Sequence, residues 1–348
     1  MSGSRVVLGI DTSAYTTSAC LVREDGFVLA DCRQVLAVAP GRRGLRQSEA
    51  VFHHVRNLPA LLAACFSRLE EKGAAAAVGV STAPRDAPDS YMPVFVAGKS
   101  CAEAIAVAAG IPCWETSHQV GHFLAALGSL PAAARELIGR RPTLFVHASG
   151  GTTEVCAVRP YAEAPEEWPA LCPVSATEDL TAGQLVDRAG VALGLPFPAG
   201  AVLEQLAAGG DAAQAHFPRA VRGDKLSFSG PAAAVERAIK DGLEPRHVAA
   251  GIYELLAGSF AAWLACLARK SGAGQLLFAG GVMASVRLQN LLAARAELAH
   301  LQLWFADRKF CTDNAVGPAL FAAGRLSGRP LYSLAINPPP LPPSGEQE

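Results

Sequence analysis

Residues 142–158, PTLFVHASGGTTEVCAV, contain two apolar runs joined by a turn of small residues. Residues 5–22, RVVLGIDTSAYTTSACLV, have the same construction, with Asp11, Thr12 and Ser13 in the turn. Short apolar runs on either side of a turn that contains Gly or Asp are typical of paired strands. The sequence therefore predicts an α/β protein in which one architecture is duplicated to give two similar lobes.

The segments around these strand pairs alternate between strand and helix patterns. Predicted strands lie at residues 27–31, 76–81, 111–114 and 275–279, and predicted helices at residues 48–68, 99–109, 181–193, 201–208, 230–240, 246–269 and 315–326. Residues 248–268 are apolar enough to suggest a membrane span. They are rich in alanine, however, and contain Glu254, Gly251 and Gly258, which favours a buried core helix.

Composition restricts the class of protein. The 348 residues are 51% hydrophobic and 18% charged, which excludes intrinsic disorder. The formal net charge of −1 argues against a protein that binds nucleic acid on its own through a broad basic surface. The nine cysteines have neither zinc-ribbon nor thioredoxin spacing, and the first residues lack the pattern of a signal peptide. We therefore expect a cytoplasmic protein with reduced thiols.

Two pairs of glycines follow predicted strands. The turn at residues 149–153, SGGTT, combines glycines, which let a backbone approach a ligand, with hydroxyl groups that can surround an anion. An ordinary hairpin turn has the same composition. Gly280 and Gly281 precede a predicted helix, where a purine or ribose could lie against the backbone, although close strand–helix packing needs glycine too. Asp187, on a predicted helix, could accept both ribose hydroxyls or face solvent.

A pair of histidines suggests a metal site. In the stretch His118-Gln119-Val120-Gly121-His122, a helix would place both imidazoles on one face, one turn apart. This spacing suits two ligands of one zinc or iron ion, and it equally suits histidines that pack or cap at a helix start. Asp313, which precedes a predicted helix, would supply a third ligand. The alternative for that segment is a helix N-cap at Thr312 or Asp313.

The order of the motifs is more specific than any one of them. GIDTS, HQVGH, SGGTT, AGQLVDRAGVALGLPFPAG, LSFSG, AGGVMAS and CTDNA follow one another along the chain. From residue 6 to about residue 323, the sequence resembles the tRNA N6-adenosine threonylcarbamoyltransferases (TsaD), formerly called glycoproteases. The resemblance implies the two-lobed fold of actin, sugar kinases and chaperone ATPases. It places the N-terminal lobe at 1–117, completed by about 305–334, the second lobe at 118–304 and a proline-rich tail at 335–348.

The resemblance also implies a reaction. TsaD proteins transfer a threonylcarbamoyl group from threonylcarbamoyl-AMP to N6 of the tRNA adenosine beside the anticodon and release AMP. The family works with a paralogous TsaB-like subunit and a small TsaE-like ATPase, and no membrane is implied. The metal, iron or zinc, would lie between the lobes, with His118, His122 and Asp313 as its ligands. The residues that would hold the adenylate are Ser149, Gly150, Gly151, Thr152, Thr153, Asp187, Gly200, Gly280, Gly281 and Ser285.

The chain departs from the family pattern near the reacting groups. An acidic pair that follows a cysteine in the family's first loop is replaced by Ala14-Tyr15-Thr16, which leaves Asp11 as the acidic catalytic candidate. Thr152 stands where the family usually has histidine. Gln184 replaces a glutamate, and Ser285 replaces an asparagine. These changes predict a divergent paralogue that keeps its metal.

Two alternatives to the family reaction stay open. One is a non-catalytic scaffold or regulator of the true synthase, and the other is a carbamoyl-transfer enzyme that uses another acceptor. A protease is disfavoured, because the histidine pair lacks the glutamate of an HExxH motif.

Overall fold

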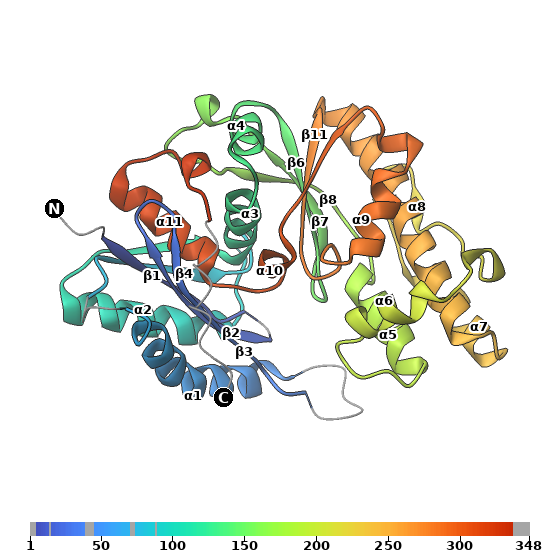
Figure 1. The fold of residues 1–348 in the computed structure, drawn as a ribbon, viewed down its shortest axis with the longest axis horizontal. Helices are drawn as coiled ribbons and strands as arrows, with labels where there is room; N and C mark the ends of the chain where they lie inside the picture. Colours follow the sequence, from blue (N-terminus) through green and yellow to red (C-terminus); the bar gives the residue numbers. More distant parts are fainter. Residues whose placement is uncertain (1–4, 14, 39–44, 70–73, 88, 337–348) are drawn as a thin grey trace, which may run out of the picture. The chain divides into compact units, whose positions relative to one another are not determined.

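The computed structural model describes residues 5–13, 15–38, 45–69, 74–87 and 89–336 (Figure 1). Ala14 and most of the predicted proline-rich tail lie outside these residues. The contacts divide the chain into two compact units. The first contains the described residues up to Ala37, those between 45 and 135, and those from Asp313 onward, and the second contains Val38 and residues 136–312.

The first unit is built on a five-stranded sheet with the order β3-β2-β1-β4-β5. Its strands are β1 (Val6–Asp11), β2 (Thr16–Arg23), β3 (Val28–Val35), β4 (Ala77–Ala83) and β5 (Cys113–Ser117). The first three strands form an antiparallel meander, whereas β4 and β5 run parallel to β1.

The second unit repeats this sheet. Its strands are β6 (Thr143–Ala148), β7 (Thr153–Val158), β8 (Leu171–Ala176), β11 (Gln275–Ala279) and β12 (Gln302–Phe305). In the order β8-β7-β6-β11-β12, three strands are antiparallel and the last two run parallel to β6. Order and directions match the first sheet strand for strand. The predicted duplication of one α/β architecture is therefore confirmed.

Helices cover both faces of the first sheet (Figure 1). On one face, α1 (Gln47–Phe66) and α2 (Val94–Ala109) bury apolar side chains against Leu8 and Ile10 of β1. On the other face, α11 (Val316–Ser327) packs against β1 and β4 and against α3 (His118–Gly128). The helix α4 (Ala132–Arg140) follows α3.

The core of the second unit surrounds one long helix. This is α8 (Pro245–Ser271), and most of its apolar side chains are buried. It is the one helix of the described chain with the length and hydropathy of a membrane span, and 78% of that window is buried, as the sequence predicted for a core helix. The other elements of this unit are α5 (Ala182–Ala192), α6 (Gly200–Ala208), α7 (Ser229–Lys240), α9 (Val286–Ala293), α10 (Arg308–Cys311) and the short pair β9 (Val221–Arg222) and β10 (Lys225–Leu226).

Glycines bring α11 against the sheet and against α3. Gly9 of β1 and Gly79 of β4 lie side by side in the register, and a Cβ atom at either would fall within 2.2 Å of a carbonyl oxygen at the start of α11. At the crossing of α3 and α11, a Cβ atom at Gly317 would lie 1.9 Å from the carbonyl oxygen of Gly121. The backbones therefore touch, which leaves no room for any side chain at these positions.

Several elements were missing from the sequence prediction, among them β8, β12 and α4. The strands β8 and β12 and the helix α4 all lie in segments without a clear apolar period. β8 contains Pro173, and β12 has only four residues at the edge of its sheet. Such strands are formed by their neighbours rather than by local propensity. The first unit keeps α3 because α3 packs on α11.

The crossing of α3 and α11 makes a testable prediction about stability. We expect Gly317→Ala to lower the free energy of unfolding by about 1–3 kcal/mol, because the added methyl group has to displace a backbone carbonyl. Chemical denaturation would measure the loss. Gly209→Ala is the matched control, because a Cβ atom there meets no other atom, and equal stability of the two variants would contradict the packing argument.

Candidate functional site

The two histidines of the HQVGH stretch lie in the first turns of α3. β5 ends at Ser117, whose hydroxyl accepts a hydrogen bond from the backbone N–H of Val120 at 3.2 Å and so caps the helix. His118 and His122 then follow one turn apart, with ring centroids 4.5 Å from each other. Because the cap is a serine, neither histidine is needed to start the helix.

Three candidate ligand atoms converge at this point. His118 Nε2 lies 3.1 Å from His122 Nε2, and Asp313 Oδ1 lies 3.3 Å from His122 Nε2 and 3.5 Å from His118 Nε2. Ligand bonds of about 2.0–2.1 Å around a tetrahedral zinc ion put neighbouring ligand atoms about 3.3–3.4 Å apart. The triangle therefore has the dimensions of one face of a metal coordination sphere, although it does not select between iron and zinc.

Asp313 is placed by its neighbour in the sequence. The side-chain oxygen of Asn314 accepts hydrogen bonds from the backbone N–H groups of Val316 and Gly317 at 3.0 and 3.3 Å. Asn314 thus satisfies the first turn of α11. The predicted alternative, a cap at Thr312 or Asp313, is not what the structure shows, and the carboxylate of Asp313 is directed to the histidines instead.

Asp11 lies beneath this triangle at the end of β1. Its Oδ2 atom lies 2.9 Å from His118 Nδ1, and its Oδ1 atom accepts a hydrogen bond from the backbone N–H of Ser13 at 3.0 Å. A carboxylate behind a metal-binding imidazole fixes the tautomer and the orientation of the ring. The carboxylate is completely buried, so its position is set by these contacts.

The charges in this cluster compensate one another. Burial lowers the pKa of His118, but the carboxylates of Asp11 and Asp313 outweigh that effect and raise it to about 10. Burial and the neighbouring His118 lower the pKa of His122. Burial raises the pKa of Asp313, yet hydrogen bonds from both histidines hold it well below its ordinary value. At neutral pH without metal, the imidazole of His118 is therefore protonated and positively charged, with a carboxylate on each side, while His122 is neutral.

The glycine turn of the second unit closes the hairpin of β6 and β7. The backbone N–H of Ser149 donates to the carbonyl oxygen of Thr152 at 2.7 Å, so the turn is a hairpin turn. Atoms built at Gly150 and Gly151 as Cβ would meet nothing within 4 Å. The turn therefore presents bare backbone to open space, and a hairpin role does not conflict with ligand binding.

The start of α5 is fitted to this turn. The hydroxyl of Thr181 donates to the carbonyl oxygen of Gly150, and the backbone N–H of Ala182 donates to the hydroxyl of Thr153, both at 2.9 Å. A Cβ atom at Gly183 would lie 2.4 Å from the carbonyl oxygen of Ser149. Gln184 completes a capping box with Thr181, which gives this glutamine a structural task. The positive end of a helix dipole thus lies next to the glycine turn.

The two glycines after β11 have different roles. Gly280 has a φ of 101°, and a Cβ atom there would lie 2.1 Å from the carbonyl oxygen of Ala148. Close packing of backbone on backbone explains this glycine. At Gly281, in contrast, a Cβ atom would meet nothing within 4 Å. Only Gly281 therefore leaves room for a ligand beside the backbone.

The remaining predicted residues of this unit already have protein partners. Asp187 accepts a hydrogen bond from the backbone N–H of Ala199 at 2.8 Å, and burial raises its pKa. The carbonyl oxygen of Gly200 accepts a hydrogen bond from the hydroxyl of Tyr253 at 3.2 Å. Ser285 caps α9 and donates to Glu204 at 2.8 Å.

The sequence analysis missed two members of this group, Glu204 and Tyr253. Burial, with the charge of Glu204, raises the pKa of Tyr253 to about 12. Tyr253 contacts Gly200, and Glu204 contacts Ser285. No motif marked either residue, because each lies on an ordinary helical face.

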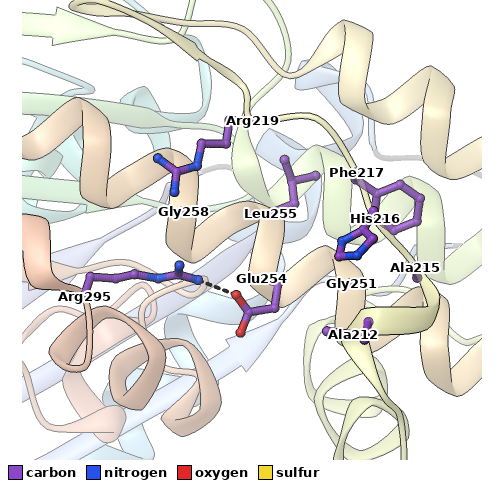
Figure 2. Close-up of a pocket in the computed structure, with 11 residues that line it drawn as sticks. Ala212, Ala215, His216, Phe217, Arg219, Gly251, Glu254, Leu255, Gly258 and Arg295 are labelled. Atoms are coloured by element: carbon purple, nitrogen blue, oxygen red, sulfur yellow. Dashed lines mark hydrogen bonds and ion pairs between the residues drawn. The ribbon is translucent and has the colours of Figure 1, made fainter.

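A surface cavity of about 370 Å³ lies elsewhere in the second unit (Figure 2). α8 contributes Glu254, Leu255 and two glycines, and the far walls hold Arg219, Arg295, His216 and Phe217. Arg295 and Glu254 form an ion pair across it (Figure 2). None of the site residues predicted from the sequence lines this cavity. Its two arginines are both paired with glutamates.

Comparisons with known proteins agree with the sequence resemblance. A family model described as "TsaD: tRNA N6-adenosine threonylcarbamoyltransferase" matches residues 38–320. A tRNA N6-adenosine threonylcarbamoyltransferase of Sorangium cellulosum (strain So ce56) is 31% identical over 354 residues, which cover 95% of each chain.

Solved structures agree with the fold. Component A of the (R)-2-hydroxyglutaryl-CoA dehydratase of Acidaminococcus fermentans has a TM-score of 0.54 and 14% identity over 93% of this chain and all of that one. HypF of T. kodakarensis has a TM-score of 0.54 and 14% identity over 95% of this chain and 49% of that one. The two five-stranded sheets and these neighbours confirm the predicted actin-like ATPase fold.

The compensated charges predict how the metal-free protein responds to pH. Because the pKa of His118 is raised to about 10 in the folded state, from about 6.5 in the unfolded chain, its contribution is fully present below pH 6.5. We expect that contribution to be lost as the pH rises to about 10, which would lower the melting temperature by a few degrees. The measurement is the difference between the wild type and His118→Gln at each pH. A difference that does not change with pH would contradict the assigned charge state.

Proposed function

Because the chain belongs to the tRNA N6-adenosine threonylcarbamoyltransferase family, we propose that it transfers the threonylcarbamoyl group of threonylcarbamoyl-AMP to N6 of the tRNA adenosine beside the anticodon. The observation that carries the proposal is the triangle of His118, His122 and Asp313, whose ligand atoms lie 3.1–3.5 Å apart. Two imidazoles from α3 and one carboxylate from the segment before α11 direct their ligand atoms to one point, which is the arrangement that a divalent cation requires. A cation explains the convergence.

The triad would hold one divalent iron or zinc ion in the first unit. A bound ion would act there as a Lewis acid and as a template for the oxygen-rich acyl group. For the ion to bind, His118 would have to release its Nε2 proton, which faces Asp313, while Nδ1–H keeps its hydrogen bond to Asp11. His122 is already neutral and needs no such change.

The adenylate would bind to the second unit. Gly150, Gly151 and Gly281 present bare backbone, and the start of α5 adds a positive helix end next to the turn. Backbone N–H groups at such a turn stabilise phosphate charge. The ribose and the base would bind at a polar group of the second unit, which consists of Asp187, Gly200, Glu204, Tyr253 and Ser285. On binding, some hydrogen bonds within this group would be replaced by hydrogen bonds to the ligand.

Asp11 is proposed as a positioning residue rather than as the base that takes the proton from N6. Both of its oxygen atoms are engaged, one by His118 and one by the N–H of Ser13. Tyr15, Thr16 and Thr152 supply no carboxylate or imidazole in its place. This observation favours a second candidate function, a non-catalytic paralogue that binds metal and nucleotide and regulates the active synthase. Transfer to an acceptor other than tRNA is compatible with the same residues.

Partners are part of the proposal. The near-neutral chain, with a formal net charge of −1, gives no broad basic surface for tRNA. A TsaB-like subunit and a small TsaE-like ATPase would contribute surface and turnover in the cytoplasm.

The proposal predicts linked loss of metal and activity. We expect about one iron or zinc ion per wild-type chain and formation of threonylcarbamoyladenosine when the protein, its TsaB-like and TsaE-like partners, threonylcarbamoyl-AMP and tRNA are combined. His122→Ala should reduce metal affinity and product at least 10-fold, because it removes a ligand. Metal analysis and mass spectrometry of digested tRNA measure both.

The matched control is His300→Ala, an exposed histidine that lies outside the triad. A wild type that binds metal without modifying tRNA would support the regulatory paralogue or another acceptor. Metal that is retained in His122→Ala would show that the triad is not the metal site.

A further inference from the structure

Three polar side chains form a row across the first sheet beneath the triad. Ser18 of β2 is the register partner of Asp11 on β1. On the other side of β1 lies the parallel strand β4, where Val80 is the register partner of Ile10. Asp11 and Ser81 are the next residues of these two strands and therefore lie next to each other. Ile10 and Val80 belong to the core under α1 and α2. Because side chains alternate along a strand, Asp11, Ser18 and Ser81 point to the opposite face, where α11 lies.

This row is sealed from solvent. Asp11, Ser18 and Ser81 each have a relative exposure of 0%. On the same face, one step back along the strands, Gly9 and Gly79 allow α11 to rest directly on the sheet. No bulk water can therefore solvate the carboxylate of Asp11. Its charge depends on hydrogen-bond donors supplied by the protein.

The donors already counted do not use the full capacity of this carboxylate. An ionised carboxylate can accept about four hydrogen bonds, whereas Asp11 accepts one from Ser13 N–H and one at His118 Nδ1. Ser18 Oγ and Ser81 Oγ are buried and are not in hydrogen-bond geometry with any group of the described chain. Burial raises the pKa of Asp11, whereas the charge of His118 lowers it. Ser81 is near enough to lower the pKa of Asp11 further.

We propose that the hydroxyls of Ser18 and Ser81 are positioning donors that hold Asp11, and through it His118, in the geometry that binds metal. This inference rests on the proposed metal site and adds a layer beneath it. Side chains that pair directly across neighbouring strands have Cβ atoms about 4.5–5.5 Å apart, which is within reach of a serine hydroxyl. The carboxylate behind a metal-binding imidazole sets the tautomer and the orientation of the ring, so donors that hold Asp11 also hold His118.

The test measures Zn²⁺ affinity of the full-length protein by competition with a chelator. We expect Ser18→Ala and Ser81→Ala each to raise the Kd for Zn²⁺ about 5-fold, because each variant loses one donor to the positioning carboxylate, and Asp11→Ala to raise it about 10- to 100-fold. Ser81→Thr keeps the hydroxyl and should restore wild-type affinity. Cys20→Ala is the matched control, because Cys20 is a buried side chain on the same face of β2 as Ser18 that does not adjoin Asp11.

The melting temperature of each metal-free variant separates loss of folding from loss of affinity. Serine variants that bind Zn²⁺ as tightly as the wild type, or a Cys20→Ala variant that loses as much affinity as they do, would overturn the inference. Failure of the wild type itself to bind Zn²⁺ would instead overturn the proposed metal site.

A second readout needs no metal. In the metal-free protein, the proton of the His118 Nδ1–H···Asp11 hydrogen bond should give a downfield NMR signal that is absent in His118→Gln. We expect Ser18→Ala and Ser81→Ala to shift this signal and Cys20→Ala to leave it in place. An unchanged signal in both serine variants would show that the hydroxyls do not act on Asp11.

Discussion

The direct contact of backbone with backbone around α11 is the constraint on which the candidate metal centre depends. Gly9 and Gly79 let the start of α11 rest on two neighbouring strands, and Gly121 and Gly317 let the same helix cross α3 without intervening side chains. His118 and His122 are carried by α3, and Asp313 stands just before α11. Their convergence within 3.5 Å follows from this crossing, because a single side chain between the helices would move the ligands apart.

Burying four titratable groups together is costly unless their charges compensate. Here the compensation is built in, since the protonated ring of His118 faces Asp11 with Nδ1 and Asp313 with Nε2, and His122 is neutral. The metal-free protein thus holds one positive charge where the proposed ion would sit. Exchange of the Nε2 proton for a cation keeps the carboxylates paired and leaves the hydrogen bond to Asp11 intact. The fold therefore tolerates the cluster in both states.

The sequence predicted most of what local patterns encode. Apolar periods revealed the duplicated strand pairs and the large helices, and the spacing of HQVGH predicted the facing of His118 and His122. Other features are set by distant contacts and have no local signal: β8 and β12 exist through their neighbours, and Asn314 rather than Thr312 or Asp313 satisfies the start of α11. Gly280 and Gly281 look alike in the sequence, yet only the tertiary approach of Ala148 separates a packing glycine from an open one.

The central claim is that His118, His122 and Asp313 hold one metal ion. X-ray absorption spectroscopy of the protein with one equivalent of Zn²⁺ tests it most directly, because the spectrum reports the ligand atoms themselves. We expect only nitrogen and oxygen neighbours at about 2.0–2.2 Å, with the outer-shell scattering of two imidazoles. A sulfur neighbour at about 2.3 Å, which would place the ion on one of the nine cysteines, or the absence of imidazole scattering would contradict it.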